Sequence, residues 1–441
     1  MPRLQWIVRR TAACLAAMLL ASSCARLPMA PSASRGTTPA GAQNVSATAG
    51  VIAQLLPGVS GTDFATSYGA SVIGTVPELR LVLMHPPAGT TDADFARRLA
   101  ADPRIEFAEP NVHLEAAEAR QSTIAFSEGW HTWGDVVDQG ALTRIHAADA
   151  QAYGRGGGVL VGILDTGIDL DHPALEPVLD LPGIEPGAGT DAGDDRAEYV
   201  DSNDDGIVDG ALGHGTHVAG IVHAVAPDAR LLAVRVLDSD GVGDAFRITR
   251  GLVLAVERGI SIANLSLGMS GQSRAVLAAL DYAVAAGVVV VAPTGNAGSS
   301  AIEFPSDVPE VVAVAGTDAN DDRASFSNYG VGVDVAAPAV GILSTYWDGG
   351  YAVWSGTSMA APFATGTAAL LYAHLGARTP ALAGLVQTLL LEGARPLAGV
   401  DPTYGAALGA GRVDAGASVS AMYASASAVG GTDPLERAPR H

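Results

Sequence analysis

Four residues whose side chains can carry out nucleophilic or acid–base chemistry stand in short glycine-containing motifs. Asp165 ends the segment VGILD and is followed by Thr and Gly, and His214 lies within GHGTHVAG. Asn296 lies within TGNAG, and Ser358 lies within SGTSMAAP. A serine hydroxyl becomes a nucleophile when an imidazole takes its proton, a carboxylate can orient that imidazole, and an amide can stabilise an oxyanion. Together these residue types predict acyl transfer.

Each residue also has an ordinary structural interpretation when it is taken alone. Asp165 fits a helix cap or a turn, Ser358 fits a helix N-cap, and Asn296 fits a turn. A single histidine is usually a packed side chain, and His217, which follows His214 by three residues, makes a metal pair conceivable. The HGTH segment lacks the glutamate and the spacing of the HExxH zinc motif. The prediction of chemistry therefore depends on all four residues occurring in one chain in this order.

From residue 158 onward, apolar runs rich in β-branched residues alternate with helix-like stretches. The expected strands are Val159–Leu164, Leu231–Val236, Ser261–Leu267, Val288–Ala292 and Val311–Ala315. The expected helices are His217–Val225, Ala245–Arg258, Arg274–Ala286 and one that follows Ser358. This pattern predicts an α/β fold with a mostly parallel central sheet and helices on both faces. Active sites of such sheets lie at the carboxyl ends of the strands, where the four residues are expected to meet.

Composition excludes several other kinds of chemistry. The chain has 441 residues with a net charge of −21, and all 25 of its basic residues are arginine. Schiff-base and P-loop mechanisms are excluded because they need a lysine. The negative charge argues against a nucleic-acid partner. The two cysteines are Cys14 and Cys24, so the chain after residue 24 has no disulfide and no thiolate metal site.

The first 24 residues predict export. Arginines precede an apolar run from Ala12 to Ala21 that is too short for a comfortable transmembrane helix. The run ends in LASSC, which resembles a bacterial lipoprotein cleavage site and makes Cys24 a candidate for lipidation; ordinary cleavage and free secretion is the alternative. Residues 25–50 are rich in Pro, Ala, Ser and Thr and predict a flexible tether. Membrane contact is expected only through such a lipid.

Residues 51–116 predict a small α+β domain without an obvious catalytic set. A strand is expected at Leu79–Met84, a helix at Thr91–Ala101, and a second strand with an extended exit at Arg104–Leu114. We expect a linker with a processing site at 117–138, a catalytic domain at 139–423 and a disordered tail at 424–441.

The motifs around Asp165, His214, Asn296 and Ser358, with LSLG at 265–268, resemble those of the subtilisin-like serine peptidases, the subtilases. The order Asp, His, Ser is also that of the subtilisin triad. The resemblance covers about residues 139–419 and implies a subtilisin-like fold. It further implies a serine endopeptidase with Asp165, His214 and Ser358 as the triad, and with the Asn296 amide as an oxyanion donor beside the Ser358 backbone N–H. No cofactor is required for this chemistry.

The segment FAEPN at 107–111 resembles the end of the family's inhibitory propeptide. The resemblance implies that the chain is made as a zymogen and that its own propeptide inhibits it. The extended segment after Asn111 would then occupy the substrate cleft, with the processing cut between Glu115 and Asp135. An unrelated α+β domain is the alternative.

The resemblance also implies that an extended protein or peptide substrate binds beside LSLG as an added strand. Met269 stands where relatives often have glycine, and Pro293 and Thr294 replace small residues, which changes two walls of the primary pocket. Glu303 is a candidate for the pocket floor that favours a basic residue before the scissile bond; a solvated loop glutamate is the alternative. The predicted substrate-binding residues are Ser266, Leu267, Gly268, Met269, Pro293, Thr294, Gly295 and Glu303.

An acidic insertion between Asp165 and His214 matches the first half of an EF-hand loop. The candidate calcium ligands are Asp201, Asn203, Asp205 and Asp209, with glycine at the sixth position of the loop. Leu212 stands at the twelfth position, where an EF-hand has glutamate, so the motif is incomplete. Structural calcium and a solvated acidic loop are both left open.

Taken together, the sequence predicts a secreted or lipid-anchored serine endopeptidase made as a zymogen. A catalytically silent lipoprotein that binds peptides in the same cleft would not need an oxyanion donor. An esterase or a peptide ligase would use the same acyl-enzyme, and analysis of the products distinguishes these activities from proteolysis.

Overall fold

The computed structural model describes residues 50–116, 118, 127–185, 193–269, 271–376 and 378–428. The predicted export signal with Cys24, most of the predicted tether, and the chain from residue 429 onward lie outside the described residues. The described residues all belong to one compact unit. The described residues contain no helix long and apolar enough to cross a membrane.

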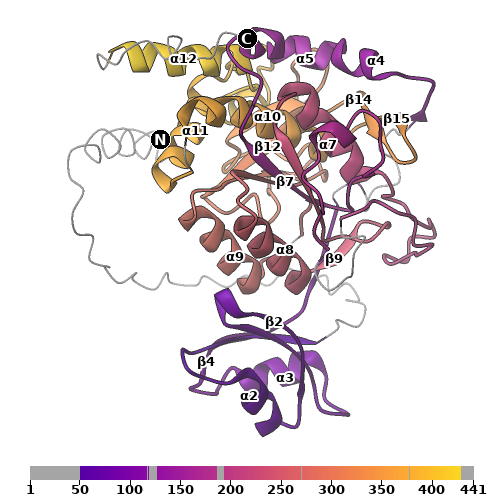
Figure 1. Cartoon of the computed structure of the whole chain (residues 1–441), viewed down its shortest axis with the longest axis vertical. Coiled ribbons are helices and arrows are strands. Elements are labelled where there is room, and N and C mark those ends of the chain that lie inside the picture. The colour runs from indigo at the N-terminus through magenta and orange to yellow at the C-terminus, as the bar shows by residue number, and fades with distance from the viewer. Residues whose placement is uncertain are drawn as a thin grey trace. The chain divides into compact units, whose positions relative to one another are not determined.

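The prodomain, which we define as residues 51–111, is built on an antiparallel sheet of four strands in the order β2-β3-β1-β4 (Figure 1). The strands are β1 (Val51–Leu55), β2 (Ser71–Val76), β3 (Leu81–His85) and β4 (Ile105–Pro110). The helices are α2 (Gly61–Ser67), α3 (Asp92–Leu99) and the short η1 (Pro77–Leu79). Ser60 and Thr91 start α2 and α3, since their side chains accept backbone hydrogen bonds from the first turns. The expected α+β character is confirmed, although β1, α2 and β2 were not predicted.

The catalytic region, which we define by the predicted bounds 139–423, contains a parallel sheet of six strands. Their order is β13-β12-β11-β10-β7-β8. These strands are β7 (Leu160–Asp165), β8 (Arg230–Arg235), β10 (Ile262–Leu265), β11 (Val289–Pro293), β12 (Val311–Thr317) and β13 (Val335–Pro338). Five of them match the predicted apolar runs. The sixth, β13, is a strand of four residues at the sheet edge and was not predicted.

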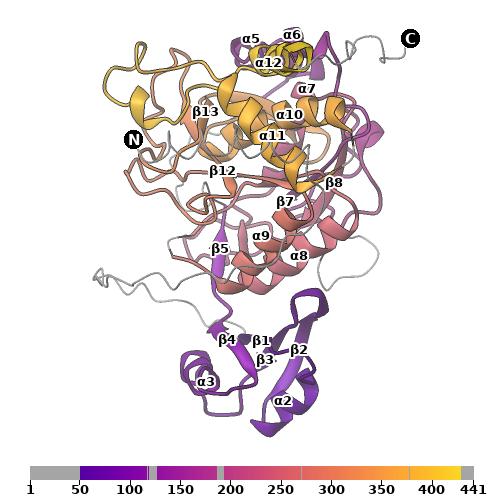
Figure 2. The same cartoon turned by 90° about the vertical axis from the view of Figure 1, so that its left-hand side faces the viewer.

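Helices cover both faces of this sheet, as the sequence predicts (Figures 1 and 2). One face carries α7 (His214–Val225), α10 (Thr357–Leu375) and α11 (Pro380–Glu392). The opposite face carries α8 (Ala245–Glu257) and α9 (Arg274–Ala285). Neighbouring residues of a strand join different hydrophobic clusters, because successive side chains point to opposite faces.

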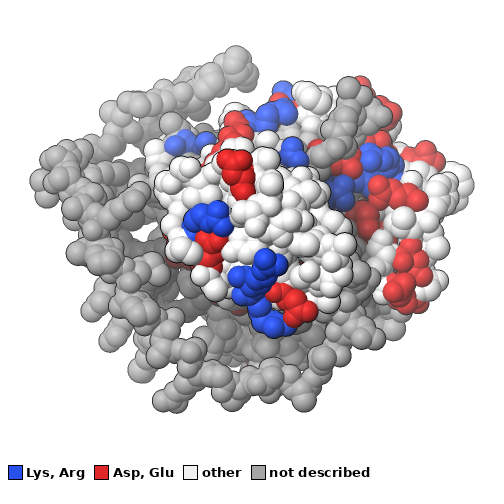
Figure 3. All heavy atoms as spheres, turned by 90° about the horizontal axis from the view of Figure 1, so that it is seen from below, with Lys and Arg blue, Asp and Glu red and all other residues white. Residues whose placement is uncertain are grey.

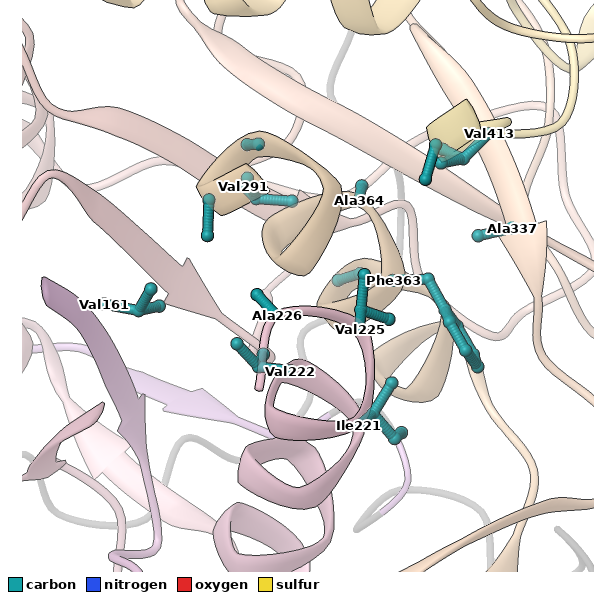
Figure 4. Close-up of a cluster of buried hydrophobic side chains, with 14 of the residues drawn as sticks. Val161, Ile221, Val222, Val225, Ala226, Val291, Ala337, Phe363, Ala364 and Val413 are labelled. Carbon is teal, nitrogen blue, oxygen red and sulfur yellow. The ribbon is translucent and has the colours of Figure 1, made fainter. Parts of the chain in front are cut away.

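Close packing of α7 on α10 supports the end of the sheet where the candidate residues lie. Figure 4 shows Ile221 and Val225 of α7 on the side of that helix toward Phe363 of α10. Gly366 permits this approach, since a Cβ atom there would lie 2.5 Å from Cβ of Val225. The two helices that begin at His214 and Thr357 are therefore held in a fixed relation to each other.

The remaining elements surround this core. They are the strands β5 (His113–Glu115), β6 (Ser127–Glu128), β9 (Val242–Asp244), β14 (Ile342–Tyr346) and β15 (Gly350–Trp354), and the helices α4 (Trp133–Val137), α5 (Gly140–Arg144), α6 (Ala147–Gln151), η2 (Glu176–Val178), η3 (Gly405–Ala407) and α12 (Ala415–Ala428). Some of these elements lie in segments predicted as a linker and a tail. The predicted linker contains β6 and α4, and α12 continues five residues into the predicted disordered tail.

Figure 3 shows acidic and basic side chains interspersed among uncharged ones on one face of the molecule. No continuous basic surface is visible among the described residues on that face.

Candidate active site

Asp165 and His214 meet at the carboxyl end of β7, where the sequence predicts the site. Asp165 is the last residue of β7 and His214 is the first residue of α7. His214 Nδ1 lies 2.7 Å from Asp165 Oδ1, and both residues are fully buried. Gly215 makes the approach possible, because a Cβ atom there would lie 2.1 Å from the carbonyl oxygen of Gly167. The glycine-rich motif thus brings the helix start against the strand end.

Ser358 is the second residue of α10 and is fully buried. Its carbonyl oxygen accepts a hydrogen bond from Ser266 Oγ at 3.1 Å, which ties the start of α10 to the segment after β10. Its hydroxyl donates to Glu118 Oε2 at 2.5 Å instead of donating to His214. The predicted serine and histidine are therefore adjacent to one carboxylate oxygen, without a direct bond between them.

Asn296 lies after β11 with its side-chain amide fixed by Thr357. Its Oδ1 accepts hydrogen bonds from the backbone N–H of Thr357 at 2.9 Å and from Thr357 Oγ1 at 2.8 Å. Its Nδ2 must then point away from Thr357, and it donates to Glu118 Oε1 at 2.9 Å. The backbone N–H of Ser358 donates to the same oxygen at 3.2 Å. Two donors thus converge on one oxygen of Glu118, and they are the two groups predicted to bind an oxyanion.

Glu118 occupies the centre of this arrangement, and sequence reasoning missed it. Its Oε2 lies 3.1 Å from His214 Nε2 as well as accepting from Ser358, and its side chain is only 2% exposed. No motif marks Glu118 in the sequence. The one available signal was the FAEPN resemblance, which predicted that the chain after Asn111 enters the cleft but named no side chain.

Charge at the site follows from these contacts. Burial lowers the pKa of His214, but the charges and hydrogen bonds of Asp165 and Glu118 outweigh it and raise that pKa to about 10. Burial raises the pKa of Glu118, but hydrogen bonds and charge from His214, with hydrogen bonds from Ser358 and Asn296, hold it below the usual value. At neutral pH the His214 imidazole is therefore protonated, with Asp165 on one side and Glu118 on the other.

His217 does not pair with His214 around a metal ion. Its Nε2 lies 3.1 Å from the carbonyl oxygens of both Ile342 and Ala352, so it ties α7 to β14 and β15. Burial, followed by the charge of His214, lowers the pKa of His217 to about 3. The Trp354 ring packs edge-on against both imidazoles, with centroid distances of 5.3 Å to His214 and 5.7 Å to His217. His217 is a packed structural histidine.

The chain reaches the site by a path that runs along the catalytic region. Near the end of β4, Glu109 accepts hydrogen bonds from the backbone N–H groups of Arg274 and Ala275 at the start of α9. Asn111 Oδ1 accepts one from the Phe246 N–H at the start of α8. Beyond these caps the chain forms β5 (Figure 2), which pairs with β9 in antiparallel fashion.

The last described residues before the site continue this pairing. Glu115 exchanges two backbone hydrogen bonds with Gly268, at 3.2 and 2.8 Å, and the Ala116 N–H donates to the Gly241 carbonyl at 2.8 Å. The segment therefore lies between two neighbouring strands as an added strand, which is the binding mode predicted for the substrate.

A family model described as "Subtilase family" matches residues 156–411. The chain belongs to the subtilase family. A second model, described as "Fervidolysin N-terminal prodomain", matches residues 51–111. The subtilase match contains all four predicted site residues, and the prodomain match ends directly before β5.

Individual relatives are also subtilisin-like. M-protease of Shouchella clausii (strain KSM-K16) is 38% identical over 273 residues, which are 60% of this chain and 64% of the relative. Subtilisin BL of Lederbergia lenta is 42% identical over 240 residues, which are 52% of this chain and 82% of the relative. The chain thus spans less than two thirds of M-protease. Fervidolysin of Fervidobacterium pennivorans shares the fold, with a TM-score of 0.69 and 24% identity over 86% of this chain and 62% of fervidolysin.

In this subtilase, the predicted pocket residues come together around Glu303. A Cβ atom on Gly268 would lie 2.8 Å from Glu303 Oε2, and one on Gly295 would lie 2.7 Å from Glu303 Cδ. The Glu303 carboxylate therefore lies between the two segments predicted to form the pocket walls. A cavity of about 400 Å³ next to it is lined in part by Met269 and Asp307.

The other predicted pocket residues are held by backbone hydrogen bonds, by β11 or by the hydrophobic core. Thr294 accepts from the Glu303 N–H at 3.1 Å, and Met269 pairs with Phe304 through two backbone hydrogen bonds. Pro293 ends β11. The Leu267 side chain is fully buried in the core, which leaves only its backbone for the predicted role.

The acidic loop of this subtilase does not assemble the predicted ligand set. Asp201 and Asn203 accept backbone hydrogen bonds from within the loop, as the first positions of an EF-hand do. Asp209, the predicted fourth ligand, instead accepts from the N–H groups of residues 198–200 and from the Ser239 hydroxyl. Within the described residues, no group of three or more His, Cys, Asp or Glu side chains is arranged to hold a metal ion. The four residues therefore do not fit calcium as predicted.

Proposed function

We propose that this subtilase is a serine endopeptidase made as a zymogen. The observation that carries the proposal is the convergence of Ser358 Oγ, the Ser358 N–H, Asn296 Nδ2 and His214 Nε2 on a single carboxylate. A carboxylate is planar like a peptide group, and Glu118 Oε1 accepts from two donors as a carbonyl oxygen can. The same four groups therefore suit a peptide carbonyl once Glu118 has left.

In the proposed mechanism, Ser358 Oγ attacks the peptide carbonyl carbon while His214 Nε2 takes the hydroxyl proton. Asp165, at 2.7 Å from Nδ1, holds the imidazole in position and stabilises its positive charge. The carbonyl oxygen becomes an oxyanion that the Asn296 amide and the Ser358 N–H stabilise. His214 then gives its proton to the leaving amine, and water releases the acyl group from Ser358 by the reverse sequence.

Labelling with a fluorophosphonate probe tests this function. We expect the processed wild type to be labelled and to hydrolyse peptide bonds, and we expect Ser358→Ala to lose both activities and to remain unprocessed. N-terminal sequencing of the processed chain should place the cut between Glu115 and Asp135. Peptide binding without labelling would indicate the silent binding module, and ester or ligation products without proteolysis would indicate the other acyl-transfer activities.

We further propose that Glu303 favours a basic residue before the scissile bond. Support comes from the carboxylate's place between Gly268 and Gly295. For each protein, kcat/KM is measured with a peptide that has Arg at that position and with one that has Leu there. The ratio of the Arg value to the Leu value should be lower in Glu303→Gln than in the wild type. The matched control is Glu310→Gln, a glutamate in the neighbouring surface segment before β12. A tenfold or greater preference of the wild type for the apolar peptide would overturn this assignment.

Export and lipidation of Cys24 remain predictions from residues outside the described part of the chain. Metabolic labelling with a fatty acid tests them, because label should be incorporated into the wild type and not into Cys24→Ala. Unlabelled wild-type protein in the medium would indicate free secretion.

A further inference from the structure

The carboxylate of Glu118 fills the position where the proposed mechanism needs a substrate carbonyl. One oxygen lies between the Ser358 hydroxyl and the His214 imidazole, and the other accepts from both oxyanion donors. We propose that the Glu118 side chain is the group that keeps the unprocessed chain inactive, by separating nucleophile from base and filling the oxyanion position. This inference rests on the proposed function and adds the chemical group responsible for the inhibition.

The contacts explain why the site cannot react in this state. Both imidazole nitrogens of His214 face carboxylates, Asp165 at Nδ1 and Glu118 at Nε2, so the doubly protonated ring is favoured. A doubly protonated imidazole has no lone pair with which to accept the serine proton. The hydroxyl proton of Ser358 is itself donated to Glu118. Nucleophile and base are both engaged by one group.

Burial makes this blocking contact strong. The Glu118 side chain is 2% exposed and that of His214 is fully buried, so water does not screen their charges. The carboxylate is contacted by four hydrogen-bond donors, which matches the acceptor-only character of an ionised carboxylate. Gly356 leaves the necessary room, because a Cβ atom there would lie 1.8 Å from Glu118 Oε1.

The path of the chain holds Glu118 at the site. The Glu109 and Asn111 caps and the pairing of Glu115 with Gly268 precede Glu118 by only a few residues. Because these contacts belong to the same chain, the carboxylate is present at a high effective concentration. Release of Glu118 therefore requires that the segment be cut or pulled out of its pairing.

The inhibition should depend on pH through the groups that face Glu118. These are His214 and, beyond it, Asp165 and His217; Ser358 and Asn296 contribute uncharged donors. Since the pKa of His214 is raised to about 10, the ion pair persists across neutral pH and weakens as the imidazolium loses its proton near pH 10. Replacing Glu118 with glutamine removes one cause of that raised pKa, so the transition should move to lower pH.

The test measures fluorophosphonate labelling of the unprocessed full-length chain, read from the full-length band at short times. Glu118→Gln and Glu118→Ala should be labelled at least about tenfold faster than wild type at pH 7, as expected for loss of a charge-assisted contact. The matched control is Glu106→Gln, which removes an exposed carboxylate from β4 of the prodomain and should label like wild type. In wild type, labelling should rise steeply toward pH 10.

The outcomes separate this inference from the proposed function. If the processed wild type is not labelled at Ser358, the proposed function fails. If the processed form is labelled but both Glu118 variants label like Glu106→Gln, the inference alone is wrong. If both variants fail to fold, the wild-type pH profile decides, and unprocessed chain that labels as fast at pH 7 as at pH 10 would overturn the inference.

Discussion

The prodomain sheet and the central sheet differ in what covers their two faces. The central sheet has a hydrophobic cluster on each side, and its own helices contribute to both clusters. The prodomain sheet covers only one face with its own helices, where Val51 and Ala53 pack against α2 and α3. On its other face, Ile52 and Phe107 join the cluster that contains α8 and α9 of the catalytic region.

This difference shows that the packing of the prodomain is completed by the catalytic region. Alternation along β1 sends neighbouring side chains into two different cores, one within the prodomain and one shared. The contact at the shared face is close, since a Cβ atom on Gly74 would lie 2.6 Å from the Phe246 ring. The catalytic region holds the reacting groups, while the prodomain supplies two helix caps and leads the chain to Glu118. The predictions below separate these two contributions.

The largest effect is expected from a change that touches the catalytic region alone. Asn296→Ala should lower kcat of the processed enzyme by about 10²–10³-fold with little change in KM, because its amide acts mainly on the oxyanion. Asn320→Ala, in an exposed turn, is the matched control. A loss below tenfold would mean that the Ser358 N–H is sufficient.

Acid should destabilise the catalytic region through its buried histidine. The pKa of His217 is about 3 when folded, against about 6.5 when unfolded, so between these values the unfolded chain binds one more proton. The His217 contribution to stability is therefore intact above pH 6.5 and falls by about 1.4 kcal/mol per pH unit as pH drops toward 3.

Unfolding free energies measured between pH 7 and 4 in the Ser358→Ala background, which prevents processing, test this. His217→Gln should flatten the slope. His85→Gln, which removes an exposed histidine of the prodomain, should not. The explanation by a buried histidine would be contradicted if the unfolding free energy had the same pH slope in the Ser358→Ala parent and in its His217→Gln and His85→Gln variants.

A smaller effect is expected at the junction of the two regions. Glu109→Ala removes the hydrogen bonds to the start of α9 and should lower the stability of the Ser358→Ala chain by about 1–2 kcal/mol. Thermal unfolding measures this against Glu106→Gln. If Glu109→Ala and Glu106→Gln had the same thermal stability, the shared apolar face alone would hold the prodomain to the catalytic region.

The smallest effect is expected at the acidic loop. Because Asp209 is committed to the amides of residues 198–200, the melting temperature of the Ser358→Ala chain should be the same in excess calcium and in chelator. A calcium-dependent rise that Asp201→Asn abolishes would restore the hypothesis made from the sequence.

Local patterns were sufficient to predict much of the catalytic region. Long β-branched runs identify five strands of the central sheet. Residues at the ends of these strands, such as Asp165, indicate the edge of the sheet at which the candidate site lies. Prediction was weaker in the prodomain. β2 is mostly exposed or half-buried, and α2 has only seven residues, so neither carries a strong periodic signal.

The sequence by itself determined which residue types carry the chemistry and which strands support them, because those signals lie within a few neighbouring positions. Only the tertiary structure decided that Glu118 lies on Ser358, 240 positions away, and that Thr357 sets the orientation of the Asn296 amide. Both results depend on contacts between distant segments, such as the pairing of Glu115 with Gly268. No local pattern encodes such contacts, since their geometry exists only after the two sheets and their helices have packed.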